Sequence, residues 1–239
     1  MLIETLRFLF QQGWMASILK GSLVTVSLGL LGMALGVVAA VPLSVARWRR
    51  IPFLSQLVDA YTAVIRSVPG LLVIYLLFFG SVQTVDRIGE VFGFRDALQQ
   101  AYSYIMGVLS IAIISTAYSV EVLRGALQSI APGGIEAARA LGFSQIMTYR
   151  RVIAPLMFRY ALGGLNNVWQ MTIKDTSLIS VVGLQELMRV SAIAAGITHS
   201  PLLFYVIAGV VFLCITWVSQ RLFDVFERAL NRGFAGARQ

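Results

Sequence analysis

The chain has 239 residues, of which 58% are hydrophobic and only 13% are charged, whereas soluble domains usually contain about 45–50% apolar and about 25% charged residues. This composition argues against a soluble globular enzyme, and the low charge excludes an intrinsically disordered chain. The single cysteine, Cys214, and the single histidine, His199, exclude a disulfide framework, a multi-cysteine metal site and every site that needs two histidines.

Long segments without charged residues alternate with short charged ones along the chain. Each long segment has about the 20 residues that an α-helix needs to cross a bilayer, and in hydrocarbon the backbone polar groups must be satisfied within the segment. We therefore predict an all-α polytopic membrane protein that forms one domain over residues 1–239, with about five transmembrane helices. The five segments are 21–46, 67–85, 97–120, 160–185, which contains only Lys174 and Asp175, and 190–220.

The N-terminal residues do not resemble a cleavable signal peptide, because Glu4 and Arg7 interrupt the apolar sequence. We expect a short amphipathic segment there, with Trp14 at the membrane interface. The first span is then retained in the mature protein.

The formal net charge of +8 is unevenly distributed. The connecting segments 47–66 and 121–159 and the C-terminal segment from 221 have an excess of arginine, whereas the N-terminal residues and the 86–96 loop do not. By the positive-inside rule, the N-terminus is expected outside and the C-terminus in the cytoplasm, which requires an odd number of spans. The basic charge is then a topology feature, and nucleic-acid binding, which would need a clustered patch, is not predicted.

The glycines of the first span indicate structure and not nucleotide binding. Gly32 and Gly36 have the spacing of residues that allow close helix packing. The sequence contains no G-x-x-x-x-G-K-[ST] phosphate-binding loop, so we expect no ATPase in this chain. No internal repeat is apparent, which disfavours a secondary transporter built from two related halves.

The segment 124–160 has the local features of two short helices. Residues 132–134 (Pro-Gly-Gly) predict a turn, and Gly142 is placed after the end of the first helix. Ser144 can cap the second helix, and Pro155 is expected to bend or end it. Three apolar residues predict one face of the first helix: Ile135, Ala138 and Leu141.

This helix pair has three interpretations. A DNA-binding helix–turn–helix would need a soluble domain around it, but predicted spans lie on both sides. A featureless cytoplasmic loop and a helix that docks into a partner's groove are both compatible with the residues. The residues alone leave these two alternatives open.

The segment 132–155 resembles the EAA loop, E-A-A-x3-G-x9-I-x-L-P, of the membrane subunits of ATP-binding-cassette (ABC) importers, with Val152 and Ala154 in place of the usual Ile and Leu. Other stretches resemble the polar amino-acid branch of that family, and most of all its permease subunits for histidine, arginine or opines. Val68-Pro69-Gly70 departs from the more frequent Thr-Pro-Leu. The similarity extends from about residue 17 to residue 228, and its most similar stretches are 60–80, 117–134 and 169–187.

The resemblance implies a type I ABC importer-like architecture in a bacterial cytoplasmic (inner) membrane. Two permease subunits pair, the second being a related chain or an identical copy, and each EAA helix docks on a dimer of ATPase subunits. An extracytoplasmic binding protein delivers the amino acid or opine, and the ATPase binds ATP and Mg, so this chain is expected to hold no cofactor and not to be an enzyme. The residues implied at the ATPase are Glu136, Ala137, Ala138, Arg139, Gly142, Arg150, Arg151 and Pro155.

Charged residues within the spans are candidates for the substrate path. A zwitterionic amino acid has a carboxylate for Lys174 and an ammonium group for Asp175. The alternative, which we favour, is that Asp175, Thr176 or Ser177 caps a short helix at a break while Lys174 reaches toward the interface.

Glu121 is the remaining candidate for the path, beside Lys174, Asp175 and Thr176. Its spacing to Arg124 predicts a structural ion pair. His199 is expected in the loop that opens the fifth span.

Two other classes of protein remain to be compared with an importer subunit. An intramembrane enzyme would need a Ser–His pair, paired aspartates or a metal site, and the sequence shows none of these convincingly. A channel or secondary transporter would act without an ATPase. Co-purification of a stoichiometric ATPase would distinguish the importer from this alternative.

Overall fold

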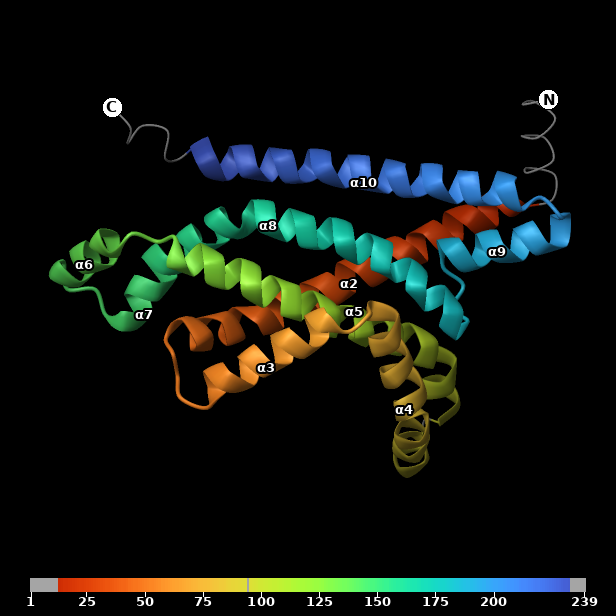
Figure 1. The fold of residues 1–239 in the computed structure, drawn as a ribbon, viewed down its shortest axis with the longest axis horizontal. Coiled ribbons are helices and arrows are strands. Elements are labelled where there is room, and N and C mark those ends of the chain that lie inside the picture. Colours follow the sequence, from red (N-terminus) through yellow and green to blue (C-terminus); the bar gives the residue numbers. More distant parts are fainter. Residues whose placement is uncertain (1–12, 94, 233–239) are drawn as a thin grey trace.

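The computed structural model describes residues 13–93 and 95–232 (Figure 1). The predicted amphipathic N-terminal segment therefore lies largely outside the described residues. The described part is entirely helical and contains no strand, which confirms the all-α prediction. Its elements are α2 (Trp14–Trp48), α3 (Leu54–Ser67), α4 (Gly70–Phe92), α5 (Arg95–Gln128), α6 (Pro132–Ala140), α7 (Gln145–Thr148), the π-helical turn η1 (Tyr149–Ile153), α8 (Ala154–Asp175), the 3-10 helix η2 (Thr176–Val182), α9 (Leu187–Thr198) and α10 (Pro201–Arg232).

Four helices are long and apolar enough to cross a membrane, and a broken span makes a fifth. The four are in α2, α4, α5 and α10, and the broken span joins Gln145–Val182 to Leu187–Thr198 with a bend of 51°. The prediction of about five spans is thus confirmed. The predicted bounds of the last span are wrong, because residues up to Thr198 belong to α9 and His199, with φ 52, separates α9 from α10. A charge-free stretch does not show where a helix turns.

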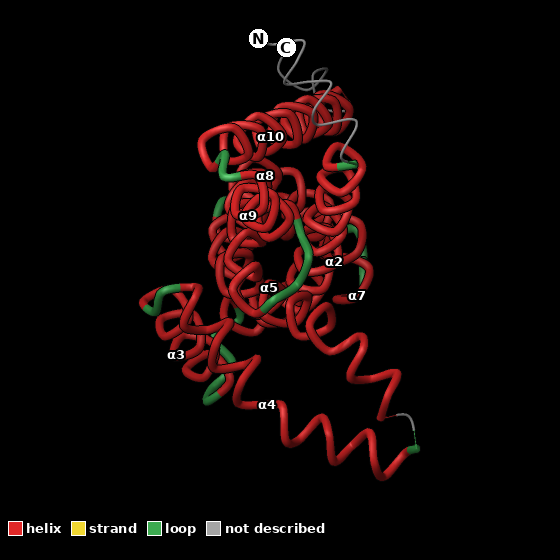
Figure 2. Tube along the Cα trace, turned by 90° about the vertical axis from the view of Figure 1, so that its right-hand side faces the viewer, coloured by secondary structure: helices red, strands yellow, loops and turns green. Residues whose placement is uncertain are grey.

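The helices pack as a bundle around α5 (Figure 1). Helix α2 lies along α5, α8 packs on α5, and α10 covers α8 and α9. The α4–α5 hairpin projects away from this bundle (Figure 2). The close α2–α5 contact depends on glycine, because a Cβ atom at Gly32 or Gly36 would collide with Ile111 or Ser115. The Ser115 hydroxyl donates a hydrogen bond to the Gly32 carbonyl at 3.2 Å, so the predicted packing role of these glycines is confirmed.

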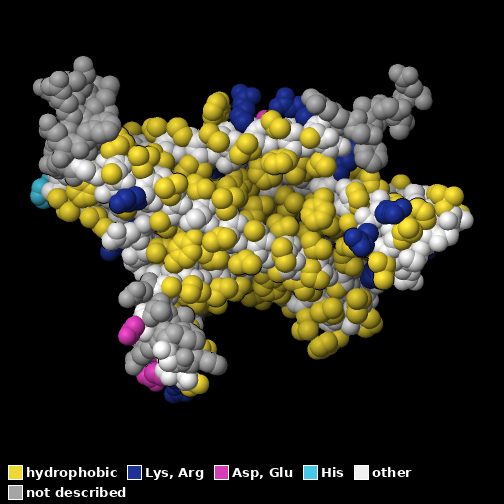
Figure 3. Space-filling view, turned by 180° about the vertical axis from the view of Figure 1, so that it is seen from behind, with side chains coloured by type: hydrophobic (Ala, Val, Ile, Leu, Met, Phe, Trp, Pro, Cys, Tyr) yellow, Lys and Arg dark blue, Asp and Glu magenta, His cyan; other side chains and the backbone are white. Residues whose placement is uncertain are grey.

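The surface of the bundle is apolar along its middle (Figure 3). Leu23, Leu76 and Leu213, for example, are 70%, 66% and 69% exposed. A soluble monomer rarely exposes so much contiguous apolar surface. This surface fits contact with lipid or with a second membrane subunit.

Two connections differ from the sequence expectation. The expected 86–96 loop is largely helix, since α4 continues to Phe92 and the chain turns at Gly93 with φ 73. The 47–66 connection contains α3, an amphipathic helix that charge spacing alone did not indicate.

The second helix predicted in segment 124–160 does not end at Pro155. This proline occupies the first turn of α8, directly after the π-helical turn, a position where proline is tolerated.

Candidate coupling site

Helices α6 and α7 form a small projection at one end of the bundle (Figure 1). Pro132 begins α6, where its fixed φ suits the first turn. Ala138 is 5% exposed, and Ile135 packs against the main hydrophobic core. Leu141 was predicted on the same face, but it follows the end of α6 and is 77% exposed. The apolar face is therefore shorter than the sequence pattern predicts.

The opposite face of α6 is exposed and built from small residues beside one carboxylate. Glu136, Ala137 and Ala140 are all exposed there. Small side chains permit a partner's backbone to approach closely, and the carboxylate can accept hydrogen bonds from it. This face can dock into a groove of another protein.

The turn between α6 and α7 is fixed by local hydrogen bonds. Gly142 has φ 80, its N–H donates to the Arg139 carbonyl at 2.9 Å, and the Phe143 N–H donates to the Ala138 carbonyl at 3.0 Å. This pattern is a Schellman motif, which needs a left-handed residue. The Ser144 hydroxyl oxygen accepts from the Met147 N–H at 3.3 Å. The predicted turn and cap are both confirmed.

A cavity of about 360 Å³ separates this projection from the end of α2. Arg139 faces the cavity, whereas Arg150, Arg151 and Pro155 are exposed along η1 and the start of α8. Among the described residues, none of these arginines has an ion-pair partner. The cavity is lined by Trp48, Arg49, Ile135, Arg139, Gln145, Thr148 and Ile153.

Helix α8 continues directly into the 3-10 helix η2, and the break of this span comes later, between Val182 and Leu187. Lys174 is exposed, Asp175 is half-buried and Thr176 is buried. The hydroxyl groups of Thr176 and Ser177 donate back to the Ile173 and Lys174 carbonyls at 2.7 and 2.6 Å. The capping hypothesis is therefore wrong, because the side chain at the start of η2 makes no cap and the helix narrows to 3-10 geometry instead.

The residue that caps a helix near this break is Glu186, which sequence reasoning missed. Its carboxylate accepts from the N–H groups of Met188 and Arg189 at 2.9 and 2.7 Å, and from the Thr25 hydroxyl at 3.2 Å. Glu186 is fully buried. Only its position ahead of an apolar run could have indicated it, since glutamate is not a preferred N-cap.

Glu121 belongs to a separate ion cluster formed by α2, α3 and α5. The predicted pair with Arg124 is confirmed at 3.0 Å, and Arg66 lies at 3.7 Å. Arg47 bridges Glu121 to Asp59 by two further ion pairs. Lys174, Asp175 and Thr176, which are consecutive in the chain, lie at the α8–η2 junction, whereas Glu121 is held among arginines elsewhere.

A polar ladder joins α8 to α10 and was not predicted. The Gln170 amide donates to Asn166 at 3.4 Å, Asn166 donates to Gln220 at 3.0 Å, and Gln220 donates to Asp224 at 3.3 Å. The amides within the fourth predicted span are the sequence feature that could have indicated it. Such side chains are expensive in lipid, so this face of the bundle is suited to contact with polar groups.

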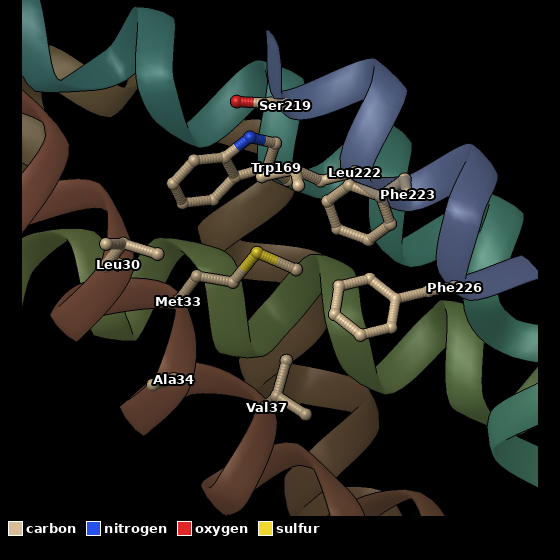
Figure 4. Close-up of a pocket in the computed structure, with 9 residues that line it drawn as sticks. All are labelled: Leu30, Met33, Ala34, Val37, Trp169, Ser219, Leu222, Phe223 and Phe226. Carbon is tan, nitrogen blue, oxygen red and sulfur yellow. The ribbon is translucent and has the colours of Figure 1, made fainter. Parts of the chain in front are cut away.

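The groove between α2, α8 and α10 is of the opposite character (Figure 4). It has a volume of about 380 Å³, and Met33 lies between Trp169 and Phe226. The Trp169 indole N–H has no hydrogen-bond partner among the described residues, and the remaining lining is apolar except for Ser219. A zwitterionic solute needs placed polar groups, so this groove is unsuited to one.

No group of three or more His, Cys, Asp or Glu side chains that could hold a metal ion occurs in the described part of the chain.

Comparison with known proteins gives a consistent result over nearly the whole chain. The family described as binding-protein-dependent transport system inner membrane component matches residues 32–232. The nopaline transport system permease protein NocQ of Agrobacterium fabrum is 41% identical, over 92% of this chain and 94% of that protein. The histidine/lysine/arginine/ornithine transport system permease protein HisQ of Salmonella typhimurium is 32% identical, over 92% and 96%. A crystal structure of an amino acid ABC transporter with histidines is 26% identical, with a TM-score of 0.74 over 93% of this chain and 98% of that one.

Proposed function

The chain belongs to the family of binding-protein-dependent transport system inner membrane components, and we propose that it forms half of the translocation path of an ATP-driven importer. It is a multi-pass permease subunit of an ABC importer and is not itself an enzyme. Of the alternatives open to the sequence, a channel or secondary transporter is not favoured, because the family and its relatives are components of transport systems.

The observation that supports coupling to an ATPase is the exposed face of α6. A rigid helix between Pro132 and the Schellman turn at Gly142 can transmit a push from a partner into α8. We place Glu136 and Ala137 at the ATPase contact, with Ala138 holding α6 against the core. Arg150 and Arg151 flank this contact, and Pro155 begins the helix that receives the motion.

The partners follow from this role. A dimer of ATPase subunits binds ATP and Mg, a second permease subunit completes the path, and an extracytoplasmic binding protein delivers the solute. The second permease is a related chain or an identical copy. In this proposal the α6 end faces the cytoplasm, the N-terminus lies outside and the C-terminus lies inside, as the arginine distribution indicates.

The proposed solute is a polar, basic amino acid or an opine. Support comes from the nopaline permease at 41% identity and the histidine/lysine/arginine/ornithine permease at 32% identity. Lys174, Asp175 and Thr176 at the α8–η2 junction are our candidates for the path. Glu121 is a weaker candidate, because its carboxylate is already occupied by Arg47 and Arg124.

Co-expression with the ATPase and a second permease tests this proposal. In lipid nanodiscs the complex is expected to hydrolyse ATP, with stimulation by binding protein loaded with arginine, histidine or an opine. Glu136→Lys should abolish ATPase assembly or coupling, whereas the matched reversal Glu227→Lys, at another exposed carboxylate, should not. An assembled, stimulated Glu136→Lys complex, or a chain that binds no ATPase, would contradict it.

A further inference from the structure

The cavity between the end of α2 and the α6–α7 projection has the chemistry of an anion site. Arg49 and Arg139 each bring a guanidinium group, and Gln145 brings an amide, to a space of about 360 Å³. The Thr148 hydroxyl proton is not available, because it is donated to the Ser144 carbonyl at 3.0 Å. Guanidinium groups bind phosphate oxygens in a bidentate manner.

The positive charge around this cavity is not neutralised by carboxylates in the part of the chain that the structure describes. Arg49, Arg50, Arg139, Arg150 and Arg151 have no carboxylate partner in the part of the chain that the structure describes. The acidic residue of the segment 132–155, Glu136, is on the exposed face of α6 and forms no ion pair with them. Figure 3 shows Lys and Arg side chains gathered at this end of the molecule. The guanidinium groups at this cavity are therefore available to an anion from outside the chain.

Two features favour a membrane lipid over an acidic segment of the ATPase. Trp48, Ile135 and Ile153 are apolar members of the lining, and Trp48 is the last residue of the long apolar helix α2, a residue type that is enriched at membrane interfaces. The cavity also lies on the α2 side of α6, whereas Glu136 and Ala137 project from the other face.

We propose that this cavity binds the phosphate headgroup of an anionic phospholipid from the cytoplasmic leaflet. Basic pockets between transmembrane helices on the cytoplasmic side suit such headgroups. The inference rests on the orientation given under the proposed function. A headgroup held by Arg49 and Arg139 bridges α2 to α6, so it stiffens the segment that receives the ATPase stroke.

The test uses the complete importer in nanodiscs of phosphatidylcholine, with and without phosphatidylglycerol, and native mass spectrometry of the retained lipid. Arg49→Gln should lower phosphatidylglycerol retention about fivefold, since one arginine near an anionic surface contributes about 1 kcal/mol. Gln145→Trp should lower it equally, because it fills the cavity without changing the charge. The matched control Arg50→Gln removes a neighbouring charge outside the cavity lining and should retain the lipid.

Three results would overturn the inference. The first is equal retention in Arg49→Gln and Arg50→Gln, which means a diffuse charge effect. The second is displacement of phosphatidylglycerol by inorganic phosphate, which means a site for a free anion. The third is retention only by permease stripped of its ATPase, which assigns these arginines to the ATPase interface. ATPase co-purification in the same preparations reports on the proposed function separately.

Discussion

Two groups of arginines in this protein are close in sequence but opposite in environment. Arg47, Arg66 and Arg124 share the carboxylates of Glu121 and Asp59 within the bundle. Arg49, at the end of α2, and Arg139, in the α6–α7 projection, line a cavity and have no acidic partner among the described residues. Arg47 is partly buried among three helices, where a charge needs a nearby carboxylate, whereas Arg49 and Arg139 are exposed and are available to an anion from outside the chain.

The difference separates a structural arginine from one available for binding. Arg47 and Arg49 are two residues apart, yet Arg47 bridges α5 to α3 and Arg49 faces the projection. Composition and the positive-inside rule treat them alike. Only the packing of α2 on α5, which depends on Gly32 and Gly36, decides which arginine meets Glu121.

Replacing Glu121, the carboxylate that the paired arginines share, should lower the stability of the protein most. Glu121→Gln leaves Arg47 and Arg124 without their common partner, and Glu121 is only 20% exposed. Removing the charged partner from such a partly buried cluster costs about 2–3 kcal/mol. We expect a clear fall in the unfolding temperature of the purified complex, measured by tryptophan fluorescence. Glu227→Gln, at an exposed carboxylate that the proposed function does not place at a partner, is the control and should leave the unfolding temperature unchanged; equal effects would remove the distinction between the two groups.

Neutralising the two neighbouring arginines compares the groups directly. Arg47→Gln should cost about 2 kcal/mol, because it removes the bridge to both Glu121 and Asp59. Arg49→Gln should change the free energy of unfolding by no more than about 0.5 kcal/mol, while lowering lipid retention. Denaturant unfolding of both variants in the same detergent measures this. A large loss of stability in Arg49→Gln would show that its side chain is structural after all.

The α6–α7 projection has no ion pair among the described residues. Its orientation therefore depends on the backbone geometry of the turn at Gly142. Gly142→Ala forces a side chain onto φ 80, which costs about 1 kcal/mol. We expect reduced stimulation of ATPase activity with little change in the unfolding of the bundle. Gly133→Ala is the matched control, because a Cβ atom there meets nothing within 4 Å and φ is ordinary. Equal coupling in the two variants would mean that the turn does not set the direction of α6.

Local patterns predicted the local parts of this structure. The turn at Gly142, the cap at Ser144 and the pair of Glu121 with Arg124 all depend on residues within four positions of each other, and all three are confirmed. Charge-free stretches gave the number of spans for the same reason. Charge-free stretches do not mark the ends of helices, but the expected loop residue His199 does separate α9 from α10.

The features that sequence reasoning missed depend on residues far apart in the chain. Arg47 and Glu121 are separated by 74 positions, and Thr25 and Glu186 by 161. No periodicity connects them. The Thr176 hydroxyl could have accepted a hydrogen bond from a following N–H group, as a helix cap does, or donated one to a preceding carbonyl. Because the backbone stays helical at this position, the hydroxyl donates to the Ile173 carbonyl. The turn and the cap between α6 and α7 were predictable because they belong to one short segment, whereas the ion cluster needed three packed helices.

The smallest expected effect lies at the edge of the paired group. Asp59 pairs with Arg47, but its side chain is 51% exposed, so water and salt screen the interaction. Asp59→Asn should therefore cost about 0.5 kcal/mol, and the loss should shrink further as salt is added. Unfolding of wild-type and variant complexes at low and high salt measures both effects. If Asp59→Asn were as damaging as Glu121→Gln at high salt, exposure would not govern the strength of these pairs. Arg47 would then depend equally on Glu121 of α5 and on Asp59 of α3.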